Sequence, residues 1–250
     1  MAMAAPWVMI MGATAMWGTA MVIPMTTITP MAITTMTEPA PTALLALVQW
    51  LSPAFPTGAF AYSHGLEQVV ADGDVHDAAS LSPWLAEILR HGAGWQDAVL
   101  LAQGLREGAD LDALDALSRA LQPSAERLQE STEQGAAFAR TAAHVTARTL
   151  PARALPLAVA EAAAPLGMPP AQVIALYLQA FAGNLVTIAT RHVPLGQSEG
   201  QAVLAGLAPL IADLAERAAR ADLEDLGNSC LAADLAAMRH ETKDVRLFRT

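Results

Sequence analysis

The chain has 250 residues, of which 54% are hydrophobic and 15% are charged, and its formal net charge at pH 7 is −10. This length suits one domain, or two small ones, with a sizeable core. The acidic balance argues against a nucleic-acid-binding protein, which needs a basic face. The one cysteine, Cys230, excludes an internal disulfide framework and a paired-cysteine metal site, and it fits a reducing, cytoplasmic location.

Residues 1–37 differ in character from the rest of the chain. Nine of the eleven methionines lie between Met1 and Met36, and the first charged residue is Glu38. No basic stretch precedes the apolar run, as it would in a secretory signal peptide. Three interpretations remain open: translation that begins at Met31 or Met36, a disordered extension, or a membrane helix within residues 2–25. We prefer the first and assign residues 38–250 to a single domain.

From residue 42 onward the sequence predicts one helix after another. Apolar residues recur at helical spacing in segments 42–51, 62–73, 82–92, 95–108, 110–121, 123–150, 156–167, 169–193 and 199–221. No segment alternates with a period of two for long enough to predict a strand. The expected fold is therefore all-α, a helical-bundle-like domain of roughly eight to ten helices.

Several of these segments carry more specific signals. Ser82 followed by Pro83 predicts a helix cap and a first-turn proline, and Pro209 predicts a kink or a break in its helix. The segment 95–108 is expected to be amphipathic. The segment 169–193 is apolar nearly all round, which is typical of a central, buried helix.

The chain ends in a short helix followed by a run of charged residues, and residues 236–250 are called the C-terminal tail below. Charged tails usually fray in solvent. However, Leu247 and Phe248 lie between Arg246 and Arg249, an arrangement typical of apolar anchors that dock into a groove on a partner.

Residues for catalysis or metal binding are scarce. No two of the six histidines lie three or four residues apart, so the sequence predicts no metal site. Tyr62, Ser63, His64 and Glu67 could form the active site of a small hydrolase, although the G-x-S-x-G elbow is missing. The simpler interpretation is structural: Ser63 caps the following helix and Glu67 suits the positive end of its dipole. Phosphate-binding glycine motifs are also missing, so the sequence predicts no phosphate-binding site of a recognisable kind.

Three sequence blocks together resemble one protein family, the urease accessory protein UreF family. They are the opening block SPAFPTGAFAYSHGLE (52–67), the second block HVPLGQSEGQAVL (192–204) and the third block LAAMRHETKDVRLFRT (235–250). The blocks occur in the family's order over about 200 residues. Lys243 and Val245 depart from the family pattern, which usually has Gln and Ser there.

The resemblance implies an all-helical homodimer without a reaction of its own. Such proteins link UreD (UreH) to the GTPase UreG in a complex that delivers nickel to apo-urease. No cofactor would be bound tightly, because nickel is handled transiently by the complex, and neither nucleic acid nor membrane would be a partner. The resemblance implies that the tail docks on UreD through Arg239, His240, Glu241, Thr242, Arg246, Leu247, Phe248 and Arg249. It also implies that the opening block contributes to a partner-binding face through Pro56, Gly58, Tyr62, Ser63, Gly65, Leu66 and Glu67.

Overall fold

The computed structural model describes residues 40–249. These residues form ten α-helices: α1 (Pro41–Trp50), α2 (Leu66–Asp72), α3 (Ala78–His91), α4 (Ala93–Gly104), α5 (Leu111–Ala120), α6 (Ala125–Thr146), α7 (Leu155–Ala163), α8 (Pro170–His192), α9 (Gln197–Ala218) and α10 (Leu231–His240). Three short 3-10 turns, η1 (Ala59–Ala61), η2 (Ala164–Leu166) and η3 (Leu223–Asp225), complete the described structure, which contains no strand. The predicted all-α fold is confirmed. The boundary expected at residue 37 and the candidate membrane helix within residues 2–25 lie outside the described residues.

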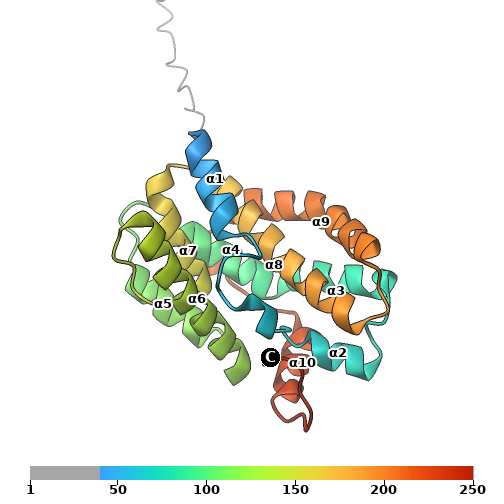
Figure 1. Ribbon diagram of the computed structural model, residues 1–250. Helices are drawn as coiled ribbons and strands as arrows, with labels where there is room; N and C mark the ends of the chain where they lie inside the picture. Colours follow the sequence, from blue (N-terminus) through green and yellow to red (C-terminus); the bar gives the residue numbers. More distant parts are fainter. Residues whose placement is uncertain (1–39, 250) are drawn as a thin grey trace, which may run out of the picture. The chain divides into compact units, whose positions relative to one another are not determined.

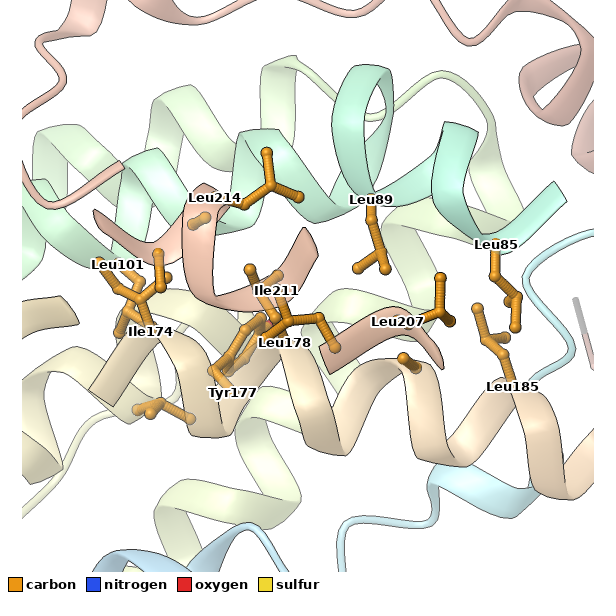
Figure 2. Close-up of a cluster of buried hydrophobic side chains, with 14 of the residues drawn as sticks. Leu85, Leu89, Leu101, Ile174, Tyr177, Leu178, Leu185, Leu207, Ile211 and Leu214 are labelled. Atoms are coloured by element: carbon orange, nitrogen blue, oxygen red, sulfur yellow. The ribbon is translucent and has the colours of Figure 1, made fainter. Parts of the chain in front are cut away.

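Helix α8 lies at the centre of the domain, as its apolar sequence predicts (Figure 1). It packs along α9 and contacts α4, α3 and α1. Figure 2 shows leucines and isoleucines of α3, α4, α8 and α9 meeting in one cluster around Tyr177. Among the described helices α8 alone is long and apolar enough to cross a membrane, but half of its most apolar stretch is buried inside the domain. Its composition is therefore that of a core helix.

Helix α4 is buried nearly all round, so the prediction of an amphipathic helix in this segment was wrong. Every residue from Gln96 to Gly104 is buried, including Asp97 and Gln103. These two polar side chains keep partners inside the domain: Asp97 accepts a hydrogen bond from Tyr177, and Gln103 donates one to the carbonyl of Ala221. Polar residues that pair in the core look like a solvent-exposed face in the sequence.

The predicted helix cap at Ser82 with Pro83 in the first turn was wrong, and the break that was one alternative at Pro209 does not occur, whereas a kink at Pro209 stays a prediction. Helix α3 begins after Asp77, whose side chain forms a capping box with Ser80, so Pro83 lies inside the helix. Pro209 lies inside α9, which continues from Gln197 to Ala218. A proline deprives the carbonyl four residues earlier of its helical partner. Both prolines are on exposed positions, where water can satisfy that carbonyl.

Candidate functional site

The opening block and the C-terminal tail, about 170 residues apart in the sequence, lie against each other. Helix α10 contacts α2 and the start of α6 (Figure 1). Gly65 allows this close approach: its φ is +75°, and a Cβ atom there would lie 2.9 Å from the backbone nitrogen of Ala237. Both the positive φ and the short distance favour glycine at this position.

Glu67, in the first turn of α2, is the main attachment point of the tail. Its side chain is only 6% exposed, and its carboxylate accepts hydrogen bonds from the backbone N–H groups of Leu247 (3.1 Å) and Phe248 (2.9 Å) and faces Nε2 of His240 at 3.2 Å. The ammonium of Lys243 lies 3.5 Å from the same carboxylate. Burial raises the pKa of Glu67, but the N–H of Phe248, the His240 ring and the N–H of Leu247 outweigh it and hold the pKa below its usual value.

His240 joins Glu67 to α6. Its ring is fully buried, and while Nε2 faces Glu67, Nδ1 lies 2.7 Å from the carboxylate of Glu126. Both ring nitrogens thus face carboxylate oxygens, one from α2 and one from α6. Glu126 also binds the guanidinium of Arg246 at 2.5 Å, and its backbone N–H donates to the carboxylate of Glu241 at 3.0 Å. The N-terminus of α6 is therefore held by three residues of the tail.

One turn and two turns further along α6, Glu130 and Glu133 face the opening block. Glu133 accepts hydrogen bonds from the Tyr62 hydroxyl and from Arg249, whose guanidinium lies 2.8 Å away. The backbone N–H of Arg249 donates to the carbonyl of Ala61 at 2.7 Å. Burial, followed by the bond to Glu133, raises the pKa of Tyr62. These contacts attach the end of the tail to the opening block.

Beneath this surface lies a buried layer of charge. Glu130 forms an ion pair with Arg127, and its carboxylate is 3.7 Å from Nδ1 of His64. Burial raises the pKa of Glu130, but Arg127 and His64 more than compensate and lower it to about 2. The His64 ring packs edge-on against Phe181 with ring centroids 5.2 Å apart, and burial lowers its pKa. The backbone of His64 has a φ of +56°, in the left-handed region that non-glycine residues rarely adopt.

The second block also contacts the C-terminal tail. Its first residue, His192, packs its ring against Phe248 of the tail, with centroids 4.7 Å apart. The neighbouring Arg191 lies over the ring of Phe60 in the opening block, 5.4 Å from the centroid. Phe248 is thus half-buried against its own domain, whereas Leu247 is 71% exposed. All three blocks that carry the family resemblance therefore meet in space.

The remaining predicted site residues have more local positions. Arg239 pairs with Asp72 at the end of α2 (3.2 Å), and the Thr242 hydroxyl bonds the carbonyl of Arg239. Leu66 is in the core, whereas Pro56 and Gly58 (φ +77°) shape the loop that leads into η1.

The structure gives no support to a catalytic set in the opening block. Ser63 is fully buried, and its hydroxyl oxygen accepts the backbone N–H of Glu67 at 3.3 Å, as expected of a residue that ties down the start of a helix. The N-cap position itself is occupied by Gly65. His64 and the carboxylate of Glu67 face different partners, α6 and the tail. Among residues 40–249, no group of three or more His, Cys, Asp or Glu side chains is arranged to hold a metal ion.

Sequence reasoning missed the residues of α6 that receive the tail, Glu126, Glu130 and Glu133. Their spacing of four and then three residues places them on one face of the helix, opposite a tail rich in arginine. This charge complementarity could have identified them. His192 was quoted within the second block, but its contact with Phe248 depends on the tertiary fold.

Comparisons with known proteins identify the family of the chain. The UreF family model matches residues 75–208 of the chain. A urease accessory protein UreF from a strain of Cereibacter sphaeroides is 62% identical over 208 residues, which cover 83% of this chain and 99% of the relative. The UreF proteins of Paracoccus denitrificans (52% identical, covering 90% of this chain and 100% of the relative) and Roseobacter denitrificans (50%, covering 83% and 94%) are also similar. On the strength of the family match and of these long, closely similar alignments, the chain belongs to the UreF family of urease accessory proteins.

Proposed function

We propose that this protein is a non-enzymatic adaptor in urease maturation. In this proposal it acts in the cytoplasm as a homodimer, links UreD to the GTPase UreG, and assists the GTP-dependent insertion of nickel into apo-urease. Nickel is the cargo of the complex and not a resident cofactor of this chain.

The observation that carries the proposal is the convergence of the three blocks around the tail. The tail is attached to the domain through hydrogen bonds and ion pairs with Glu67, Glu126 and Glu133, and it leaves Val245 and Leu247 more than 70% exposed. A partner's polar groups can replace such hydrogen bonds, whose net contribution to stability is modest, and exposed apolar side chains beside an arginine are suited to anchor on another protein. This arrangement supports a docking role for the tail.

The experiment that tests the proposal is co-purification. The chain translated from Met36 is expressed with UreD and UreG from the same genome, with and without the last twelve residues (239–250), and the complexes are sized by light scattering. We expect a dimer-centred complex that depends on the tail. Capture of UreD by the shortened chain at the normal level would refute the docking role.

A point substitution separates docking from folding. Phe248→Ala should reduce capture of UreD while the domain stays folded, because this ring packs at the edge of the domain. Leu223→Ala shortens an apolar side chain that is 42% exposed and lies outside the tail, and it should leave capture unchanged. Equal effects of the two substitutions would contradict the proposal.

A further inference from the structure

A cavity of about 100 Å³ lies between the loop that follows α1, helix α6 and helix α8. Its lining is of two kinds: aromatic side chains, including Trp50, Phe138 and Phe181, and a charged group formed by Asp97, Arg127 and Glu130. Of the site residues described above, Phe60, Arg127, Glu130 and Phe181 also line this cavity, whereas Glu67, Glu126 and Glu133, which hold the tail, do not. The cavity is therefore largely separate from the contacts that hold the tail.

The charges in the cavity do not balance. Arg127 is paired with Glu130, whereas within residues 40–249 the carboxylate of Asp97 accepts a hydrogen bond only from the hydroxyl of Tyr177, at 2.6 Å. Asp97 is 8% exposed, and burial raises its pKa to about 6 although Tyr177 and Arg127 act in the opposite direction. At neutral pH the lining therefore holds two carboxylates and one guanidinium. Arg127 acts on Asp97 without forming an ion pair with it. A buried carboxylate that lacks a direct ion pair is costly, and a cation in the cavity would relieve that cost.

A second observation also indicates an occupant. Ser131 of α6 is 7% exposed and lines the same cavity, and its hydroxyl finds no hydrogen-bond partner among residues 40–249. Buried hydroxyl groups nearly always have a partner, because leaving one unpaired is unfavourable. An occupant that carries hydrogen-bond donors would serve both Ser131 and Asp97.

We propose that this cavity receives the guanidinium group of an arginine side chain presented by a partner protein. The guanidinium is planar, carries only donors, binds carboxylates with two parallel hydrogen bonds and stacks on aromatic rings. Its size fits, since a cavity of about 150 Å³ holds benzene, with six heavy atoms, and a guanidinium has fewer. A protein is the source that we favour, because Ser52, Pro53 and Thr57 of the opening block line the cavity. In this respect the inference rests on the proposed function, which assigns the opening block to a partner-binding face.

The test uses N-acetyl-arginine amide as the probe and N-acetyl-citrulline amide as its neutral counterpart of the same shape. Each is titrated into the full chain, and binding is followed by NMR and calorimetry. We expect the arginine derivative to bind and the citrulline derivative to bind at least about tenfold more weakly, because a charge-assisted hydrogen bond is lost. Asp97→Asn keeps an acceptor for Tyr177 and should weaken binding of the arginine derivative by a similar factor. Asp74→Asn, which removes a charge from an exposed turn, is the matched control and should have no effect.

Three results would overturn the inference. Equal binding of the two derivatives would remove the role of the charge, and no binding of either would mean that the cavity holds only water. Binding of ethylguanidinium without binding of the arginine derivative would refute a partner's arginine and indicate a small free cation. None of these results depends on UreD or UreG, so failure here is distinguishable from failure of the adaptor role in co-purification.

Discussion

Replacement of Glu67 by glutamine should release the C-terminal tail without unfolding the domain. The carboxylate accepts the N–H groups of Leu247 and Phe248 and faces the ring of His240. Glutamine keeps the shape and one acceptor oxygen, but it removes the charge that strengthens these hydrogen bonds. Hydrogen bonds to charged groups contribute about 1.5–3 kcal/mol each, so a net loss of about 2 kcal/mol in the free energy of tail opening is a moderate expectation.

The assay for this prediction is hydrogen exchange of individual backbone amides. A loss of about 2 kcal/mol lowers protection of the Leu247 and Phe248 amides about thirtyfold, while amides in α8 keep theirs. Glu133→Gln is the matched control: its partner Arg249 is 61% exposed, and exposed ion pairs contribute about 0.2–1 kcal/mol, so the loss of protection should stay below about fivefold. Unchanged protection in Glu67→Gln, or an equal loss in α8, would refute the reasoning.

Three further predictions concern pH and packing. The pKa of Glu67 in the folded state is below its ordinary value of 4.5, so the contribution of Glu67 to tail docking is complete above about pH 4.5 and is lost as the pH falls through the lowered pKa. Hydrogen exchange of the tail amides, measured from pH 6 down to pH 3, should show this release. Protection that does not change with pH would contradict the prediction. The pH dependence expected for Asp97 is opposite to that of Glu67, because its pKa rises from 3.8 to about 6 on folding. The free energy of unfolding should therefore fall by up to about 3 kcal/mol between pH 4 and pH 6. Urea unfolding at the two pH values measures this fall, which Asp97→Asn should remove. Gly135→Ala should lower the free energy of unfolding by at least about 2 kcal/mol, because a Cβ atom there would lie 2.0 Å from the carbonyl oxygen of Arg153. Gly206→Ala, where a Cβ atom would have no atom within 4 Å, should instead be neutral or stabilising by up to about 1 kcal/mol. Similar losses of stability for the two substitutions in urea unfolding would rule out the steric argument.

Much of the helical framework could be predicted from the sequence, because apolar periodicity reports directly on burial. The segment that forms α8 is the clearest case, since an apolar surface on every side leaves only a central position. The prolines predicted the ends of helices less well than apolar periodicity predicted burial. Pro83 and Pro209 each remove one backbone donor, but on an exposed face the freed carbonyl can bond to water, and the packing of the helix decides where it begins and ends.

The candidate site could be predicted only in part, for a related reason. Tyr62, Glu67 and the tail residues were identified through the family resemblance, whereas Glu126 and Glu130 belong to a segment whose polar side is typical of a solvent-facing surface. That side is buried in the structure because the tail and the opening block cover it. A polar helix face has the same sequence whether it faces water or a charged segment of the same chain. The sequence alone does not distinguish the two.

The contacts of Glu67 and Glu126 also impose an order on the synthesis of the protein. Both residues receive their partners from residues 240–248, which are synthesised after helices α1–α9. Until then the carboxylates at the starts of α2 and α6 remain hydrated, and α10 has not closed over Gly65. A nascent chain paused before residue 240 therefore carries an open acidic surface, and synthesis of the residues that follow allows this surface to close.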